Sequence, residues 1–179
     1  MAFIRIKKIK GIEYAYIVEN SWQENKVRQK VKKYLGKVYK FERKKFENEE
    51  HELTSFIEFV SDELEHYLAV VDSKKILLDI VRWELNNHGF KQDEKNIQLW
   101  KNEVCRFNEK LIAVTNDSKA DVTFGFNDGL LNTFKLRKLL RLNYAGEEQE
   151  VGYKIAKDLV ELGLKVPKEL FIGLFQKMY

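Results

Sequence analysis

Hydrophobic spacing changes along the chain from a strand period to a helix period, and this change limits the possible folds most strongly. Residues 1–40 favour strands, because FIRIKKI and IEYAYIVEN are rich in β-branched and aromatic residues and Lys10-Gly11 can form a hairpin turn between them. Residues 27–35 alternate as a third strand, and Gly36 suggests a bend after it. From residue 56 onward, apolar side chains recur at helical spacing. The sequence therefore predicts an α+β fold with an N-terminal three-stranded antiparallel module packed on a mostly helical body.

The body is expected to contain a second small β-sheet among its helices. Ser55 and Glu58 match a capping box, in which hydroxyl and carboxylate satisfy free backbone donors at a helix start. Helices are expected over residues 55–71, 73–87, 134–142, 148–162 and 167–178. Strands are expected around residues 103–107, 111–115, 121–126 and 130–134, with a hairpin turn at 127–129. The expected core comprises Phe56, Val60, Leu64, Ile80, Leu159, Phe171 and Leu174.

Composition indicates a folded protein of one domain or two small packed domains. Its 179 residues are 44% hydrophobic, without an apolar run long enough to span a membrane and without a signal-peptide core near the start. Cys105 is the single cysteine, which excludes an internal disulfide and a cysteine-based zinc cage. We therefore expect a cytoplasmic protein with no membrane partner. Abundant Lys, Glu and Ile with a single proline are also typical of thermophilic proteins.

Charge is distributed very unevenly along the chain. Residues 1–45 carry fourteen Lys or Arg against four Glu, whereas residues 46–72 carry nine acids and no Lys or Arg. The change of sign predicts a basic β-rich module over residues 1–45, followed by a body over residues 46–179. The basic end favours binding to a polyanion. Alternatively, the acidic segment folds against the basic segment and neutralises it.

The third expected strand presents the sharpest candidate surface. Successive side chains of a strand face opposite sides, so Arg28, Lys30, Lys32 and Tyr34 are expected on one face. The opposite face, with Val27, Val31 and Leu35, is expected to pack on the helical body, and Lys33 is the exception there. A bulge in this strand would break the alternation. On the first strand, Arg5, Lys7 and Lys8 extend the cation row. Several cations on one rigid face suit phosphate binding through counterion release.

Four aromatic residues lie close in sequence to this row, namely Tyr14, Tyr16, Trp22 and Tyr34. The favoured interpretation of the rings is that they belong to the core. The alternative is an exposed ring that stacks on an unpaired base.

Residues 14–38 resemble the short N-terminal β-rich segment of insertion-sequence transposases of the DDE class. The matching positions are Tyr16, Val18, Glu19, Asn20, Val27, Arg28, Gln29, Lys30, Tyr34, Leu35 and Gly36. The resemblance covers about the first fifth of the chain and implies a nucleic-acid-associated module. It does not imply transposition, because nothing after residue 45 resembles an RNase H-like core and no acidic triad can be transferred.

A second basic element consists of Lys135, Arg137, Lys138 and Arg141. They alternate with leucines on a short predicted helix, which is followed by a turn and a longer helix. This order is compatible with a helix-turn-helix, but the favoured interpretation is a helix that is solvated on one side.

Enzyme signatures are absent from the sequence. The three histidines are dispersed, the glycines form no phosphate loop, and the aspartates match no metal motif, so neither a metal nor a cofactor is expected. The leading hypothesis is a non-enzymatic nucleic-acid-binding protein, with RNA or a ribonucleoprotein ahead of DNA. One alternative is an assembly module that docks an acidic protein partner or self-associates. A metal-dependent nuclease is the third.

Overall fold

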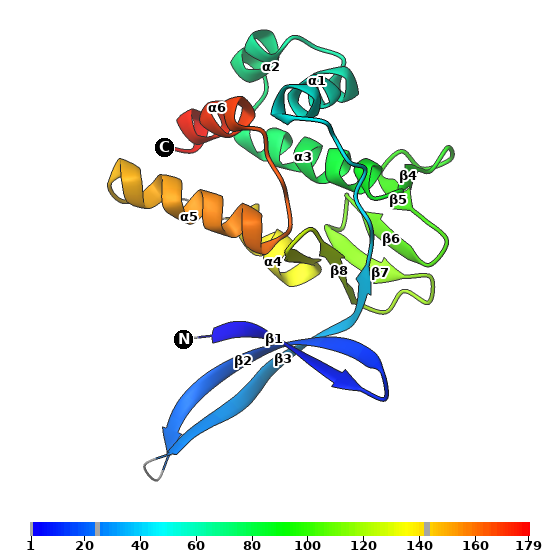
Figure 1. The fold of residues 1–179 in the computed structure, drawn as a ribbon, viewed down its shortest axis with the longest axis vertical. Helices are drawn as coiled ribbons and strands as arrows, with labels where there is room; N and C mark the ends of the chain where they lie inside the picture. The colour runs from blue at the N-terminus through cyan, green and yellow to red at the C-terminus, as the bar shows by residue number, and fades with distance from the viewer. Residues whose placement is uncertain (1, 24–25, 142–143) are drawn as a thin grey trace.

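The computed structural model describes residues 2–23, 26–141 and 144–179, which form an α+β fold with two sheets (Figure 1). The helices gather at one end of the molecule, and the first three strands project from the other end. No helix in the described ranges is both long and apolar enough to cross a membrane.

The larger sheet joins the two ends of the molecule. Strands β1 (Ala2–Ile9), β2 (Ile12–Gln23) and β3 (Lys26–Lys40) pair antiparallel. The β3 strand then pairs in parallel with β8 (Val122–Phe126), which pairs with β9 (Gly129–Asn132). The three N-terminal strands therefore belong to one five-stranded sheet, and the expectation of a sheet of their own is corrected. The physical reason is that the last residues of β3 expose backbone donors and acceptors that β8 satisfies.

Two bulges interrupt β3 next to the candidate surface. Ala15 pairs with Gly36 and Tyr16 with Tyr34, so Leu35 is an extra residue in β3. Ile17 pairs with Lys33 and Val18 with Val31, so Lys32 is a second extra residue. Each extra residue changes which later side chains share a face. The predicted common face of Arg28, Lys30, Lys32 and Tyr34 is therefore wrong.

The bulges also change which apolar residues of β3 are covered. Leu35 is buried as expected, but Val31 is 46% exposed, so the expectation that Val31 packs on the body is wrong. The side chain of Val27 lies outside the described part of the structure. Gly36 does not end the strand, because β3 continues to Lys40.

The expected second small sheet is present, and it is antiparallel. It contains β4 (Lys91–Gln92), β5 (Leu99–Lys101), β6 (Cys105–Asn108) and β7 (Ala113–Asn116), in that order. Sequence analysis predicted the two longer strands of this sheet, β6 and β7. It missed β4 and β5, which are too short to show an alternation of apolar and polar residues.

The described helices are α1 (Glu49–Val60), α2 (Leu64–Val70), α3 (Ser73–Asn87), α4 (Thr133–Leu139), α5 (Glu148–Glu161) and α6 (Lys168–Met178). The predicted helix start at Ser55 is wrong, because Asn48 caps α1 by accepting the N–H of His51. Ser61, in the left-handed region at φ 54°, ends α1 and separates it from α2.

The main core lies where the helices meet the two sheets. Among the predicted core residues, Phe56, Ile80, Leu159 and Leu174 are buried, whereas Val60, Leu64 and Phe171 are partly buried and pack against the core. Four rings, Phe41, Phe90, Phe124 and Phe126, contact one another at its centre. Phe41 directly follows β3, so the core holds the base of the projecting strands in place.

Candidate nucleic-acid interface

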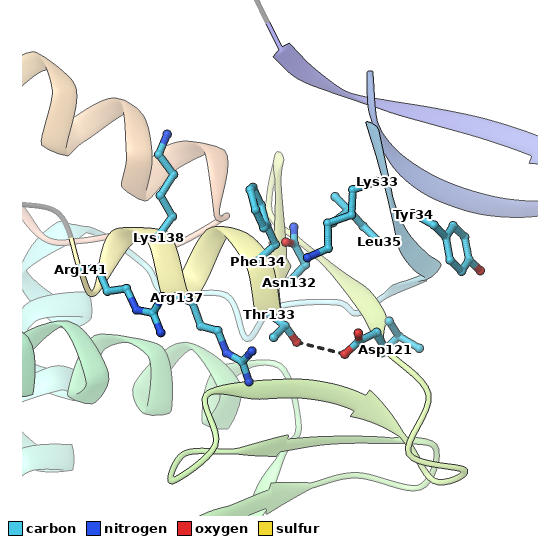
Figure 2. A pocket seen from close by; sticks show the side chains of 11 residues that line it. Lys33, Tyr34, Leu35, Asp121, Asn132, Thr133, Phe134, Arg137, Lys138 and Arg141 are labelled. Atoms are coloured by element: carbon cyan, nitrogen blue, oxygen red, sulfur yellow. Dashed lines mark hydrogen bonds between the residues drawn. The ribbon is translucent and has the colours of Figure 1, made fainter. Parts of the chain in front are cut away.

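A cleft of about 640 Å³ lies between β3 and α4, and we call it the basic cleft. Its lining residues are Lys33, Tyr34, Leu35, Asp121, Val122, Asn132, Thr133, Phe134, Arg137, Lys138 and Arg141 (Figure 2). Four of them are cationic and only Asp121 is acidic. The fold thus brings together the two basic segments that the sequence shows far apart.

The short α4 helix supplies two of the four cleft cations, and Arg141 follows just after its end. Asn132 caps it by accepting the N–H of Lys135, and the buried Leu136 and Leu139 hold one side against the core. This attachment turns Arg137, Lys138 and Arg141 outward, where all three are exposed.

The three cations differ in how firmly they are held. Arg137 donates to the carbonyl oxygens of Ile112 (3.1 Å) and Leu111 (2.7 Å), which fixes its guanidinium against the loop between β6 and β7. Within the described residues, Lys138 and Arg141 make no ion pair with a carboxylate. These two side chains can therefore contact a phosphate without breaking an internal contact.

Lys135, the fourth predicted cation of this helix, does not reach the cleft. Its Nζ lies 2.6 Å from Glu161 Oε2 on α5, and its side chain is largely buried. The ammonium group lowers the pKa of the Glu161 carboxyl, through the hydrogen bond first and the opposite charge second. Lys135 therefore joins α4 to α5, and we remove it from the binding residues.

Lys33 takes a place in the cleft that sequence analysis did not assign. Its Nζ lies 4.8 Å from the ring centroid of Phe134, toward which it extends in Figure 2. Lys33 does face the body at Phe134, but unbroken alternation had placed it on the face opposite Arg28 and Lys30, and that part is wrong because the bulge at Lys32 puts all three cations on one face. The sequence could not predict the cleft, because α4 is far from β3 along the chain.

Strand register shows which other cations share the side of Lys33. The pairs Ile17–Lys33, Glu19–Lys30 and Ser21–Arg28 lie on one face, and Lys8, opposite Glu13, is on it too. The corrected row therefore runs from the basic cleft toward the end of the β2–β3 hairpin. Lys32 occupies a bulge, and its Nζ lies 2.8 Å from Glu19 Oε2.

The opposite face carries three tyrosines and further cations, and we call Tyr14, Tyr16 and Tyr34 the tyrosine face. Ring centroids are 6.3 Å apart for Tyr14 and Tyr34, and 5.3 Å apart for Tyr16 and Tyr34. Arg5 and Lys7 pair with Tyr16 and Tyr14 on this side of the sheet, away from Arg28 and Lys30. The two cations therefore do not extend the row on the cleft side.

The rings near the basic strand are not core residues, which corrects the favoured interpretation. Tyr34 is 52% exposed and Trp22 is 76% exposed, while Tyr14 and Tyr16 are half-buried. Burial first and the neighbouring phenols second raise the pKa of Tyr34. The hydroxyl of Tyr34 therefore stays protonated at neutral pH.

Acidic residues 46–72 do not cover the basic strands. Helices α1 and α2 lie at the end of the molecule opposite the β2–β3 hairpin (Figure 1). The buried Glu52 of α1 instead forms ion pairs with Arg43 and Lys165. The basic faces of the projecting strands remain exposed.

Some other titratable groups of the described ranges have structural roles. Asp62 and His66 form a surface pair, with 2.9 Å between Oδ1 and Nδ1. Burial raises the pKa of the Cys105 thiol to about 12, so the thiol stays protonated at neutral pH as a structural cysteine. Across the described ranges, no three His, Cys, Asp or Glu side chains come together as a metal site would need.

Comparison of this chain with protein-family models, with curated proteins and with solved structures finds no match.

Proposed function

We propose that this protein binds nucleic acid in the basic cleft, as a binding protein rather than an enzyme. The observation that carries the proposal is the convergence of Lys33 from β3, Arg137 and Lys138 from α4, and Arg141 just after α4 on one cleft. The resemblance of residues 14–38 to a transposase-associated segment supports the same class of partner. RNA or a ribonucleoprotein is preferred over DNA, because proteins read RNA mostly at unpaired bases and aromatic side chains lie close to the cleft.

Phosphate binding explains why cations gather there despite their mutual repulsion. Each cation that neutralises a phosphate releases condensed counterions, so the affinity depends on salt in proportion to the number of contacts. Two packed elements hold the cations, and Arg137 is fixed further by two backbone carbonyls. Less side-chain freedom is then lost on binding than on a flexible basic tail.

The test compares the salt dependence of binding for two double variants. Lys138→Ala with Arg141→Ala removes two cleft cations, and Lys168→Ala with Lys177→Ala removes two exposed cations of α6 as the matched control. Fluorescence anisotropy with labelled RNA and DNA oligonucleotides measures the dissociation constant from about 50 to 200 mM salt. We expect the cleft variant to bind more weakly, with a slope of log K against log salt that is shallower by roughly 1.4 to 1.8.

The α6 control should keep the slope of the unmodified protein. Equal slopes for both double variants would remove the basic cleft as the binding site. Absence of binding to every oligonucleotide at low salt would reject the function itself.

A second candidate function is assembly through charge. Glu47, Glu49 and Glu50 are exposed at the start of α1, at the end of the molecule opposite the projecting basic strands. This polarity supports head-to-tail self-association or docking of an acidic protein partner. Light scattering without nucleic acid, over the same salt series, distinguishes it: an oligomer that dissociates as salt rises favours assembly, and a monomer throughout rejects self-association.

A further inference from the structure

We propose that the tyrosine face stacks on unpaired bases, so that the partner is a single strand rather than a duplex. This inference rests on the proposed function and names its substrate class. Bases in a duplex are stacked on one another, whereas the faces of unpaired bases are free to stack on aromatic side chains.

The three rings form an open platform. Tyr34 lies on β3 and its two neighbours lie on β2, at centroid separations of 5.3 and 6.3 Å. The interplanar angles of 39° and 47° show that the rings are tilted and do not cover one another face to face. Part of the Tyr34 ring surface therefore remains available to a base.

Cations surround these rings on the same side of the sheet. Lys7 Nζ lies 5.4 Å from the Tyr16 ring centroid, and Lys37 is opposite Tyr14 in the β2–β3 register. Arg5, opposite Tyr16, donates to the Gln29 side chain. Rings flanked by cations match a strand of alternating bases and phosphates, and this charge complementarity favours nucleic acid over an apolar protein surface.

The open edge of β3 explains how one ligand can reach both faces. The strand pairs with β8 only from Lys37 to Lys40, and the Thr123 hydroxyl of β8 also donates to the Leu35 carbonyl, so among the described strands none pairs with this edge of β3 before Leu35. Tyr34 also lines the basic cleft and points to the other side of β3 from Lys33 (Figure 2). A single strand can bend around this edge, whereas a duplex has a persistence length of about 150 base pairs and cannot.

The test uses three labelled probes of equal length, about 12 nucleotides. They are an oligouridine single strand, an RNA duplex, and an abasic single strand that keeps the phosphates and lacks the bases. We expect the unmodified protein to bind oligouridine most tightly. Tyr34→Leu should weaken oligouridine binding at least about fivefold and leave abasic-strand binding unchanged.

Two further variants control the result. Tyr34→Phe keeps the ring and should bind oligouridine within about twofold of the unmodified protein. Tyr153→Leu removes a ring that is 70% exposed on α5, far from β3 in the sequence, and should have no effect. Circular dichroism verifies that each variant is folded.

The outcomes separate this inference from the proposed function. If the unmodified protein binds the three probes equally, and the cleft double variant still binds more weakly, base stacking is overturned and nucleic-acid binding stands. A fivefold loss for Tyr34→Leu on the abasic strand would also overturn it, because the effect would then be unrelated to bases. No binding of any probe would overturn both.

Discussion

Gly36 occupies the position in β3 where the strand first comes alongside β8. Its φ is 94°, and a side chain there would collide with the backbone of Asp121 and Val122. Both the backbone conformation and the available space therefore require glycine. We expect Gly36→Ala to lower the free energy of unfolding by more than about 2 kcal/mol, measured by urea denaturation.

Gly11 provides the matched control for Gly36, because its φ is 82° but no atom lies within 4 Å of the place that an alanine methyl group would occupy. Gly11→Ala should cost only the conformational term, about 1 kcal/mol. Equal losses for the two variants would show that close packing against β8 does not constrain Gly36.

At the scale of elements, α4 has two sides with different tasks. Its cleft side carries Arg137 and Lys138, and its other side is joined to α5 by the ion pair between Lys135 and Glu161. We expect Lys135→Ala to cost about 0.5–1 kcal/mol at neutral pH and to leave oligonucleotide affinity unchanged. The same anisotropy titration and a urea denaturation measure the two effects.

The ion pair also predicts a pH dependence with a definite sign. Because the pKa of folded Glu161 is lowered, its contribution is complete above the unfolded value of about 4.3 and is lost as pH falls through the folded value. The stability difference between the unmodified protein and Lys135→Ala should therefore shrink in acid. A difference that stays constant from neutral to acidic pH would contradict the pairing.

Across the whole molecule, Arg43 connects the segment after β3 to the helices. Its guanidinium donates to both carboxylate oxygens of Glu84, at 3.1–3.2 Å. It also forms an ion pair with Glu52, whose Oε1 accepts no hydrogen bond from it. Glu84 also accepts the backbone N–H of Lys165, before α6. Removal of Arg43 would leave the buried Glu84 without that cation and Glu52 with Lys165 alone, so we expect Arg43→Met to cost about 3–5 kcal/mol.

The double variant Arg43→Met with Glu84→Met tests this reason. It removes both the cation and one of the buried carboxylates, so it should be more stable than Arg43→Met alone. Thermal unfolding followed at the far-ultraviolet signal gives the comparison. A double variant less stable than the single one would show that packing of the side chains, rather than the unpaired charge, sets the cost.

Local signals in the sequence determined much of the secondary structure. The hairpin turn at Lys10-Gly11 follows from two residues that adopt positive φ, here 50° and 82°, and α3 begins where Asp72 accepts the N–H groups of Lys74 and Lys75. The helical period alone located α5, whose Val151, Ile155 and Leu159 are buried. These features depend on residues within a few positions of one another, so a sequence contains them directly.

Only the tertiary structure decided the faces of β3 and the partners of α4. The bulge at Lys32 reverses the alternation that placed Tyr34 beside Arg28, and strand register depends on packing against distant residues. The same holds for the parallel pairing of β3 with β8, which brings Lys33 to Phe134 and separates Lys135 from the cleft. The sequence does not show on which face of a strand a lysine or arginine lies when the register is unknown. Contacts between distant segments therefore decide which cations lie together.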